Sequence, residues 1–532
     1  KDLNSKMNHK GQNASAVVDC LCLGTGRFLR NVLVPMLNSA GLTPALIQTR
    51  GTSFVEYLSN QNDAFSYPIE TVLPSGEIIT DTVSCCAAFT VGTSEGRAIT
   101  HDFIRSLSLD VKIIGVGVTE AGLASANTSA MQNLFEIIQV IFYKSIENQR
   151  DDLKVVILNT DNVLNNGNVI HSHLKTLAGV NTATSEQKNL LAFINRNVLC
   201  LNTMVDRITS ARPDDPMVPR AEPMPRKALV ILDPNGDLSW FPCLPGLIIR
   251  KTQEGIDSDL GLKLRIANGT HTALAHAMAL QGMVSTELLV YNQQLWIESY
   301  LESLVQHQIL QASPYCMEES LSCWEDWKKR LAHPYFGLST FFITQNGAAK
   351  AGIRWSGTII DLISKGHPIK VSMAFAYASL IRWLTPMEKL ENGIYVGWLD
   401  SRNDNSGTRE GGVVYGDSMR FNLEAGWYEF KCSCDFGGIS FSDHLMQIAS
   451  PEPRVLYPII REFLVSQQGG ALGSISESNQ LQILIKAIST LVARMLDGLT
   501  NKDLMAEIYL KQGIFEQGFH TDCSIVANEW LD

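Results

Sequence analysis

The sequence predicts an α/β protein, with a Rossmann-type N-terminal domain on a mainly parallel sheet and a largely α-helical C-terminal domain. Three observations lead to this prediction. An apolar run at 16–23 ends in glycine and is followed by apolar residues at helical spacing over 28–39 and by a second apolar run at 44–48. Strand and helix patterns then alternate, and beyond about residue 255 the sequence shifts to long helical patterns. The first three segments make one right-handed βαβ crossover.

The elements of the first domain follow from their local patterns. We expect strands over 110–119 and 154–159 with a helix over 131–148 between them. The stretch 67–91 alternates around a Pro-Ser-Gly turn at 74–76, which predicts an antiparallel excursion attached to the sheet. Five prolines crowd into the segment Thr209–Pro225, which predicts an irregular crossing segment.

The second half of the chain is organised differently. Amphipathic patterns predict helices over 262–282, 285–308, 324–332, 357–364, 371–384, 458–467, 480–499 and 502–512. The segment Gly393–Cys434 is rich in glycine and aromatic residues, predicts loops with a hairpin, and suggests no function. We therefore divide the chain into a disordered tail (1–15), a nucleotide-binding domain (16–250) and a mainly helical substrate-binding domain (251–532).

Composition narrows the class of protein. Of 532 residues 45% are hydrophobic and 18% are charged, as in ordinary globular proteins. The net charge of −11 argues against nucleic acid as a partner. No apolar run is long enough for a membrane span, so we expect a soluble, cytoplasmic protein, either a monomer or a homodimer. The 11 cysteines form no paired C-x-x-C motifs, which predicts reduced thiols and no bound metal.

The turn at Gly24–Arg30 carries part of a nucleotide-binding motif. It has the first two glycines of G-x-G-x-x-G, Gly24 and Gly26, but Leu29 stands in the place of the third. Gly24 permits a tight turn, Gly26 lets backbone amides approach a pyrophosphate, and the following helix start is favourable for anions. A tight turn without a ligand remains the alternative.

The end of the second strand bears on the choice of cofactor. An acid normally holds the adenosine ribose there, but this chain has Gln48, Thr49 and Arg50. Arg50 either meets a 2′-phosphate, which would favour NADP, or is an ordinary surface arginine.

The segment 263–271 places three chemically useful side chains in a helical setting. At about 100° per residue, Lys263, Asn268 and His271 share one face within an arc of about 140°. In a dry cleft desolvation would lower the pKa of the lysine, which could then act as a general base toward an alcohol. The amide could donate a hydrogen bond to the reacting oxygen, and the imidazole could hold a neighbouring hydroxyl. A solvated polar face is the alternative.

These residues resemble a known family. The K-x4-N-x2-H spacing of Lys263, Asn268 and His271 is similar to the signature of the polyol-specific long-chain dehydrogenases/reductases, the mannitol dehydrogenase family. Its members include mannitol 2-dehydrogenase, mannitol-1-phosphate 5-dehydrogenase and the fructuronate and tagaturonate reductases. The Gly24–Arg30 turn resembles the family's nucleotide-binding variant, which lacks the third glycine. Further similar segments follow in the same order, at 58–65, 118–122, 159–162, 166–167, 202–207 and 221–223.

The resemblance implies an enzyme that interconverts a sugar alcohol and a ketose by hydride transfer, with NAD or NADP as cofactor and without metal. It implies that Lys263 is the general acid/base, that Asn268 and Asn202 polarise the reacting oxygen, and that His271 holds the substrate. The expected cofactor-binding residues are Gly24, Gly26, Phe28, Arg30, Arg50, Thr119, Glu120 and Asn162. The expected substrate-binding residues are Asp206, Arg207, Lys365 and Lys370.

The sequence also departs from the family. In some mannitol dehydrogenases a glutamate three residues before the lysine passes protons, whereas this chain has Leu260 preceded by Asp259. Either the proton route differs or Asp259 substitutes. Lys365, His367 and Lys370 are either counterparts of the family's basic substrate-binding residues or ordinary loop charges.

The substrate stays open among related compounds. We favour a hexitol such as mannitol, or mannitol 1-phosphate, with fructose or fructose 6-phosphate as the ketose, over a hexuronate of the fructuronate or tagaturonate kind. The alternative from another class is a catalytically inactive nucleotide-binding regulatory protein. A metal-dependent alcohol dehydrogenase is disfavoured because the Cys and His residues are not grouped.

Overall fold

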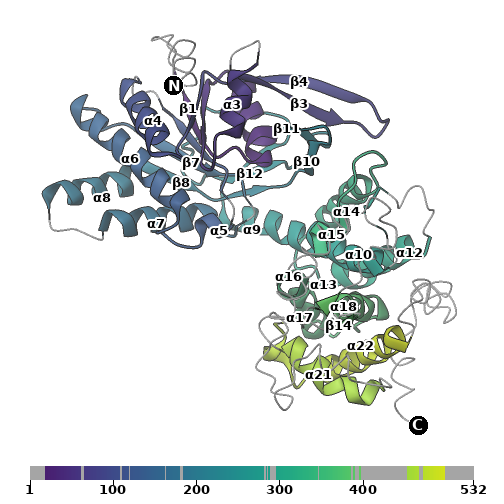
Figure 1. The fold of residues 1–532 in the computed structure, drawn as a ribbon. Coiled ribbons are helices and arrows are strands. Elements are labelled where there is room, and N and C mark those ends of the chain that lie inside the picture. The colour runs from purple at the N-terminus through teal and green to yellow at the C-terminus, as the bar shows by residue number, and fades with distance from the viewer. Residues whose placement is uncertain are drawn as a thin grey trace. The chain divides into compact units, whose positions relative to one another are not determined.

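The structure is a computed structural model that forms two compact units, Lys1–Leu260 and Gly261–Asp532 (Figure 1). It describes residues 18–497 except for 62–64, 108–110, 119, 162, 180–183, 281–282, 284, 288–294, 345–346, 385–387, 390–394, 397–451 and 466–470. The predicted tail at 1–15 and the predicted helix at 502–512 lie outside the described residues. Of the segment Gly393–Cys434 only β15 (Tyr395–Val396) is described, and it pairs antiparallel with β14 (Glu388–Lys389).

The first unit is built on a six-stranded parallel sheet. Its strands are β1 (Cys20–Leu23), β2 (Pro44–Gln48), β5 (Ala87–Thr90), β6 (Ile113–Val116), β7 (Val155–Asn159) and β8 (Val198–Leu201). They lie in the order β5-β2-β1-β6-β7-β8, and every neighbouring pair is parallel. This is the Rossmann order 3-2-1-4-5-6, in which the direction of winding reverses beside the first strand. The predicted fold class is confirmed, and the glycine turn follows β1 at the reversal point.

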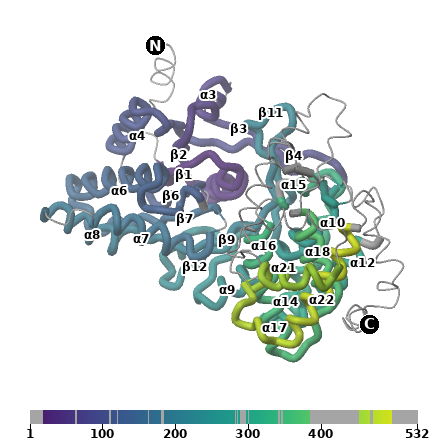
Figure 2. Tube along the Cα trace, turned by 60° about the horizontal axis from the view of Figure 1, so that its bottom comes forward, coloured from purple at the N-terminus to yellow at the C-terminus, as the bar shows by residue number. Residues whose placement is uncertain are grey.

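Helices cover both faces of this sheet (Figure 2). One hydrophobic core joins it to α4 (Ser94–Ser106), α6 (Ser129–Glu147), α7 (Asn166–Gly179) and α8 (Ser185–Asn197). A second core joins it to η1 (Leu29–Leu33), α2 (Val34–Ser39) and α3 (Ser53–Ser59). The short helix α5 (Glu120–Leu123) follows β6. Successive residues of β1 enter different cores, because side chains alternate along a strand and this strand is buried on both faces.

Threonines begin three of the helices. The side chains of Thr93 and Thr128 accept hydrogen bonds from the backbone N–H groups of Gly96 and Met131. Thr184 forms a full capping box with Gln187 at the start of α8. Each cap satisfies N–H groups that have no partner inside the helix, which stabilises the helix by about 1 kcal/mol.

A second, four-stranded sheet is attached to the first unit. It consists of β3 (Ser66–Val72), β4 (Ile78–Ser84), β10 (Thr209–Arg212) and β11 (Asp215–Ala221), in the order β10-β11-β3-β4. The antiparallel pair β3–β4 confirms the predicted hairpin, and Gly76 closes its turn with a φ of +88°. The end of the predicted excursion is wrong, because Ala87–Thr90 joins the main sheet as a strand parallel to β2.

The prediction of an irregular crossing segment is also wrong, because β10 and β11 are strands. Proline cannot donate a hydrogen bond, which normally excludes it from a central strand. Here β11 pairs with β3 only at Arg220 and Ala221, so Pro216 and Pro219 lie outside that pairing. A third sheet has the order β13-β12-β9, with β9 at Thr203–Val205, β12 at Leu229–Leu232 and β13 at Leu247–Arg250.

The second unit is helical in its described part, apart from the small β14–β15 pair. Its helical segments begin with η2 (Lys263–Asn268) and α10 (Gly269–Leu280), which follow α9 (Gln253–Leu262) along the chain. Then follow α12 (Leu295–Leu304), η3 (Val305–Ile309), α13 (Leu310–Ala312), α14 (Met317–Leu331), α15 (Thr340–Thr344), α16 (Gly347–Arg354), α17 (Ser356–Ser364), α18 (Val371–Leu384), α21 (Pro453–Val465), η5 (Gly473–Ile475) and α22 (Asn479–Asp497).

The helix α10 lies at the centre of this unit. All its residues except His271 are buried, and it packs against α12, α15, α16 and α18. A helix that is apolar on all sides is typical of such a core position. The predicted helix over 285–308 begins too early, because Ser285 instead forms a β-bridge with Ser339.

Candidate active site

The glycine turn after β1 is held between two neighbouring strands. The backbone N–H of Gly24 donates to the carbonyl of Ile47 at 2.7 Å, and that of Gly117 donates to Leu23 at 2.7 Å. Gly24 has a φ of +109°, and a Cβ atom there would lie 2.6 Å from the carbonyl oxygen of Gly117. Only glycine fits this position, because any side chain would be strained and would overlap the backbone. Gly26 is exposed, as an approach to a ligand requires.

The missing third glycine is replaced by glycines on the neighbouring strand. In the usual motif the third glycine lets the helix pack closely on the sheet. Here a Cβ atom on Gly115 would lie 2.6 Å from Cδ2 of Leu33, and one on Gly117 would lie 3.1 Å from Cβ of Leu29. The space for close packing is therefore left by β6 and the residue after it, rather than by the helix.

The turn is followed by a π-helix, η1, whose backbone carbonyls accept hydrogen bonds from side chains of the first unit. The carbonyl of Arg30 accepts a hydrogen bond from the hydroxyl of Tyr67 at 3.1 Å, and that of Asn31 accepts one from Arg207 at 2.7 Å. These donors satisfy carbonyls that the wider turn would otherwise leave open. The guanidinium of Arg30 donates to the carbonyls of Thr25 and Met217.

Arg30 and Arg207 therefore shape the turn. Arg207 also donates to the carbonyl of Glu222 at 2.7 Å, so its guanidinium is engaged in the first unit. Direct contact of Arg30 with cofactor, or of Arg207 with substrate, stays a prediction. Asp206 is half-buried, and its backbone N–H donates to the carbonyl of Ala228 at 2.9 Å.

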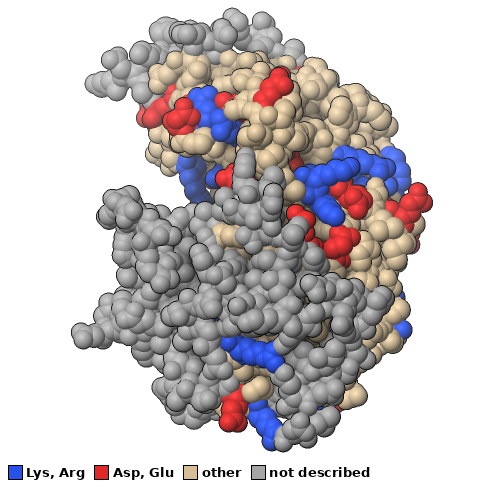
Figure 3. All heavy atoms as spheres, turned by 90° about the vertical axis from the view of Figure 1, so that its right-hand side faces the viewer, with Lys and Arg blue, Asp and Glu red and all other residues tan. Residues whose placement is uncertain are grey.

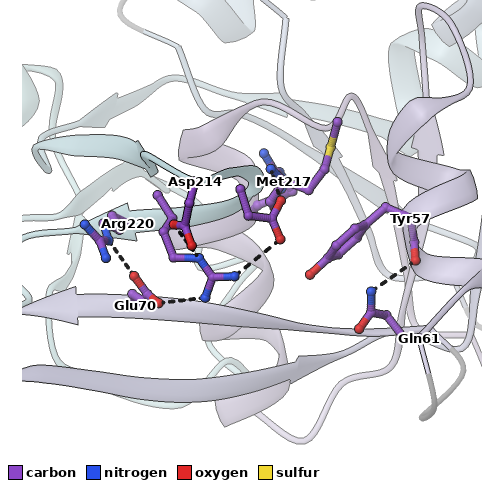
Figure 4. Close-up of polar contacts among 9 residues, drawn as sticks. Tyr57, Gln61, Glu70, Asp214, Met217 and Arg220 are labelled. Atoms are coloured by element: carbon purple, nitrogen blue, oxygen red, sulfur yellow. Dashed lines mark hydrogen bonds and ion pairs between the residues drawn. The ribbon is translucent and has the colours of Figure 1, made fainter.

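The strand β11, whose Met217 carbonyl accepts a hydrogen bond from Arg30, is held in place by a buried carboxylate (Figure 4). Glu70 on β3 forms ion pairs with Arg212 at 3.1 Å and with Arg220 at 2.5 Å, and its side chain is 7% exposed. Arg212 pairs in addition with Asp214 at 3.3 Å. The cluster ties β10 and β11 to β3 and so fixes the carbonyl of Met217 that Arg30 contacts.

At the end of β2, where an acid normally holds the adenosine ribose, Gln48 makes contacts that hold the local backbone. The side-chain oxygen of Gln48 accepts from the N–H groups of Phe54 and Val55, and its amide donates to the carbonyl of Arg50 at 2.7 Å. Gln48 thus caps α3 and braces the loop. The side chain of Arg50 is exposed, and Phe28 is half-buried against the core of the first unit.

An orphaned amide supports the fit of a nucleotide at this edge of the sheet. Asn159, the last residue of β7, is fully buried, and neither side-chain atom has a hydrogen-bond partner within the described part of the chain. Leaving a buried polar group unpaired costs about 1–3 kcal/mol, so a bound polar group is expected to satisfy it. Thr119 and Asn162 lie outside the described residues, as does the side chain of Glu120.

The glycine turn and the orphaned amide together fit NAD or NADP. The sheet's carboxyl edge at the reversal point is where dinucleotides bind in this fold. In the sequence Asn159 was noted only within a segment that is similar to the family. The signal that could have identified it is an amide at the end of a buried apolar strand.

Lys263 and Asn268 begin and end a second π-helical segment. Lys263 is only 7% exposed, and Asn268 is half-buried. The predicted arc assumed a regular α-helix, whereas in a π turn residues i and i+5 are hydrogen-bonded neighbours. The two residues are therefore closer along the helix face than the α-helical spacing implies. The solvated polar face is wrong for Lys263, which is buried.

His271 lies one turn further on, in α10, and one of its two ring nitrogens contacts an arginine. Its Nε2 lies 3.2 Å from Nη1 of Arg354, and its ring centre lies 5.8 Å from that of Trp327. Its Nδ1 is buried without a hydrogen-bond partner among the described residues. Burial lowers the pKa of His271 well below 6.5, and the cations of Arg354, Lys350 and Lys263 lower it further. The imidazole is therefore neutral at ordinary pH.

Two basic residues near His271 were missed in the sequence. Arg354 also donates to Thr272 Oγ1 and, at 3.4 Å, to the carbonyl of Asn268, while Lys350 donates to the carbonyl of Ile343 at 2.7 Å. Both belong to α16. The signal was present, because two cations four residues apart share one face of a helix.

Asn202 is placed in the first unit, between β8 and β9. It is 6% exposed, and its side-chain oxygen accepts from the backbone N–H of Asn168 at 3.1 Å. That bond leaves the amide group to serve as the donor. Because Asn268 belongs to the second unit, the joint action of the two amides stays a prediction.

Asp259 is committed to ion pairs within the first unit. Its carboxylate contacts Arg250 at 2.7 and 3.0 Å and Lys227 at 2.5 Å, and its side chain is fully buried. Both oxygens are held by cations, which argues against the alternative in which Asp259 replaces the family's proton-conducting glutamate. The proton route itself stays a prediction.

The expected substrate contacts at 365–370 are partly engaged elsewhere. The ammonium of Lys365 donates to the carbonyls of Ala312 at 3.0 Å and Ser313 at 2.9 Å, where it caps the end of α13. This favours a structural role for Lys365. The backbone N–H of Lys370 donates to the side chain of Gln308 at 3.0 Å, and a role of its half-buried side chain in substrate binding stays a prediction.

Two searches of the described residues gave negative results. No helix among them is both long and apolar enough to cross a membrane. In the same residues no group of three or more His, Cys, Asp or Glu side chains could hold a metal ion. Figure 3 shows one face of the molecule, on which basic and acidic side chains of the described residues are interspersed.

Comparisons with known proteins agree with the geometry. No curated protein matches the chain in sequence. The structure of Pseudomonas fluorescens mannitol 2-dehydrogenase, a ternary complex with NAD and D-mannitol, is similar with a TM-score of 0.62 and 15% identity, covering 94% of this chain and 95% of that one. A D-sorbitol dehydrogenase in substrate-free form has a TM-score of 0.58 and 15% identity, covering 90% and 96%. Residues 18–229 match the model of the mannitol dehydrogenase Rossmann domain. The match to this family's Rossmann domain covers the nucleotide-binding part of the chain, and the likeness to the two solved structures is one of fold.

Proposed function

We propose that this protein is an NAD(P)-dependent polyol dehydrogenase that interconverts a sugar alcohol and its ketose without a metal ion. The observation that carries the proposal is Lys263, an amine that is 7% exposed in a π-helical segment ending at Asn268 and close to a neutral His271. A buried lysine beside an amide and an imidazole is a set of groups suited to moving the proton of an alcohol. The match of residues 18–229 to the mannitol dehydrogenase Rossmann domain supports the same reaction class.

The first unit would hold the dinucleotide. The tight turn at Gly24, the exposed Gly26 and the helix start after it suit the pyrophosphate, and Asn159 offers a buried amide at the same edge of the sheet. When bound, NAD(P) supplies the hydride acceptor or donor. Arg50 is exposed at the end of β2, where it would meet a 2′-phosphate.

The proton is handled by this chain's own residues. In the oxidation direction the neutral amine of Lys263 accepts the proton of the substrate hydroxyl, and in reduction the ammonium returns it to the carbonyl oxygen. The side-chain amide of Asn268 donates a hydrogen bond to that oxygen and stabilises its developing negative charge. His271 holds a further oxygen of the substrate. These groups perform the work that a zinc ion performs in other alcohol dehydrogenases.

The favoured substrates are a hexitol or its phosphate, with mannitol and mannitol 1-phosphate first. A second candidate is the reduction of a hexuronate such as fructuronate or tagaturonate. The observation that favours it is the charge around His271, where Lys263, Lys350 and Arg354 all act on the imidazole. Cations at this place suit a carboxylate and a phosphate equally, so they favour an anionic substrate over an uncharged hexitol.

A catalytically inactive nucleotide-binding protein is the proposal from another class. It gives no reason for keeping a cationic side chain buried in a helix, which carries a substantial desolvation cost. The buried Lys263 therefore favours an active enzyme.

A substrate panel tests the proposal. NAD(H) and NADP(H) are each assayed with mannitol, sorbitol, mannitol 1-phosphate, fructose, fructose 6-phosphate, fructuronate and tagaturonate, with and without a chelator. We expect turnover of at least one pair, unchanged by the chelator. Tight nucleotide binding without turnover of any compound would favour the regulatory protein instead. Activity that a chelator removes and zinc restores would contradict the metal-independent mechanism.

A further inference from the structure

The guanidinium of Arg354 determines which nitrogen of His271 carries the proton. Its Nη1 has two hydrogens and lies 3.2 Å from Nε2 of His271 and within hydrogen-bond distance of Thr272 Oγ1, while the carbonyl of Asn268 is further away at 3.4 Å. A guanidinium has five N–H donors and no acceptor. The hydrogen bond is therefore possible only if Nε2 of His271 carries a lone pair and no proton.

The remaining proton of the imidazole must then be on Nδ1. Within the described part of the chain, the charges that act on the ring are those of Lys263 in η2 and of Lys350 and Arg354 in α16, and the ring of Trp327 in α14 lies 5.8 Å away. These cations and burial disfavour an imidazolium, so the ring carries one proton. Nδ1 is buried and has no hydrogen-bond acceptor among the described residues. The ring thus presents an unsatisfied N–H donor on the side away from Arg354.

We infer that Arg354 is a positioning residue that fixes His271 as the neutral Nδ1–H tautomer, so that the imidazole donates a hydrogen bond to an oxygen of the bound polyol or ketose. The inference rests on the proposed function for the identity of that oxygen. Without Arg354 the proton can move to Nε2, and Nδ1 would then be an acceptor that cannot hold a carbonyl oxygen. Arg354 itself makes no contact with the reacting atoms in this assignment.

The first experiment needs no substrate. The full-length protein is labelled with ¹⁵N-histidine, and long-range ¹H–¹⁵N spectra at neutral pH distinguish the protonated from the unprotonated ring nitrogen. Because the chain has 11 histidines, His271→Ala identifies the signal. We expect Nδ1–H in the wild type, a shift of the proton toward Nε2 in Arg354→Met, and retention of Nδ1–H in Arg354→Lys, which keeps a cationic donor.

A matched control removes an arginine from another part of the second unit. Arg461 in α21 pairs with Glu477, and Arg461→Met should leave the His271 signal unchanged. A wild-type His271 that carries its proton on Nε2, or an imidazolium, would overturn the inference. So would a folded Arg354→Met variant that keeps the Nδ1–H tautomer. If that variant does not fold, the wild-type spectrum alone still decides.

The second experiment is the pH dependence of KM for the ketose. Loss of the Nδ1–H donor in Arg354→Met should raise KM about 3- to 10-fold near neutral pH, the usual range for one hydrogen bond. KM should then fall toward the wild-type value as the pH decreases, because an imidazolium again has a proton on Nδ1. We expect kcat to change much less, since Lys263 is intact.

A KM that is raised equally at every pH would mean that Arg354 acts only through its charge or its packing, which contradicts the tautomer role. The two experiments also separate this inference from the proposed function. If no polyol or ketose is turned over, the proposed function fails, whereas the ¹⁵N spectrum still decides the tautomer.

Discussion

At the scale of single residues, Lys263 is the side chain on which the chemistry depends most. It is buried at the first position of a π-helical segment, and Asn268 closes that segment. A lysine that accepts an alcohol proton must be neutral, and one that protonates a ketose must be charged. The two directions of the reaction therefore need opposite protonation states of one group.

Replacing Lys263 by alanine tests this role. Turnover should fall by about 10²–10⁴-fold, the usual effect of a positioned acid/base, while cofactor affinity is nearly unchanged. In the wild type oxidation should rise and reduction should fall with pH through one ionisation, and this ionisation should disappear in Lys263→Ala. Steady-state rates across pH in both directions measure it.

Lys329→Ala, which removes an exposed lysine of α14, is the matched control and should keep wild-type rates and the same profile. If Lys263→Ala keeps both as well, Lys263 is not the base, and the assignment of the site from the family fails with it.

The sequence predicted part of this site and missed another part for a physical reason. Lys263, Asn268 and His271 were visible because their spacing is local and similar to a known signature. Lys350 and Arg354 were visible only as two cations on one helix face, because Arg354 meets His271 through the packing of α16 on α10, which no local pattern encodes. Lys365 was named from the resemblance, with an ordinary loop charge as the alternative, and its ammonium donates to the carbonyl of Ala312, a contact that no local pattern encodes.

At the scale of elements, the glycine turn and the helix after it depend on close contacts with β6. A substitution at Gly24 tests how the turn depends on these contacts. Gly24→Ala places a Cβ atom 2.6 Å from a backbone oxygen at a φ of +109°, so the backbone must move. We expect a loss of about 2–4 kcal/mol in the free energy of unfolding and a loss of nucleotide binding. Denaturant titration and a fluorescence titration with reduced cofactor measure the two effects.

Gly41→Ala is the control for the cost of the backbone conformation alone. Gly41 has a φ of +74°, but nothing lies within 4 Å of an added Cβ atom. This variant should lose only about 1 kcal/mol and bind nucleotide normally. Equal effects of the two variants would show that the contact with Gly117 is unimportant.

The packing of the turn's helix on β6 predicts a coupling between Gly115 and Leu33. Gly115→Ala brings a Cβ atom within 2.6 Å of Cδ2 of Leu33, which should cost about 1–3 kcal/mol by overpacking. In a Leu33→Ala background that overlap disappears, so Gly115→Ala should cost much less there. A double-mutant cycle of unfolding free energies measures the coupling, and strictly additive effects would contradict the role assigned to the strand glycines.

The elements themselves were predictable where one local pattern decides them. The helix over 371–384 was predicted with the bounds that the structure gives, and the strands at 113–116 and 155–159 lie within their predicted ranges. The strands β10 and β11 were missed, because prolines argue against a strand unless its pairing with the neighbour is short. The π-helices η1 and η2 were missed because the apolar spacing was interpreted with the α-helical period.

At the scale of the whole molecule, the chain forms two compact units. The first unit resembles the family closely enough for a match over 18–229, because the nucleotide site constrains its turns and strand ends. Over 94% of the chain the likeness to a solved structure is one of fold, at 15% identity, since many apolar sequences fill a helical core. The substrate could not be predicted for this reason, as residues that bind it from the helical unit have no local signature.

The buried histidines of the helical unit make its stability dependent on pH. His276 is fully buried, its Nδ1 donates to the carbonyl of Thr272 at 2.7 Å, and burial lowers its pKa from 6.5 to about 3. Between those values the unfolded chain binds a proton that the folded chain does not, so stability decreases as pH falls from about 6.5 toward 3. His271 acts in the same direction, because its pKa is also lowered.

The prediction is a free energy of unfolding that falls between pH 7 and pH 4 more steeply in the wild type than in His276→Asn. Asparagine can keep the hydrogen bond to Thr272 but does not titrate. The slope of the unfolding free energy against pH should therefore be smaller in the variant by the contribution of one proton, about 1.4 kcal/mol per pH unit at most. Urea titrations at pH 7, 6, 5 and 4 measure both slopes, and taking their difference cancels the carboxylates, which titrate equally in both proteins. The variant should start less stable, since the smaller side chain leaves a cavity, but that offset does not depend on pH. Parallel slopes would show that His276 titrates normally in the folded protein and is therefore not held neutral by burial.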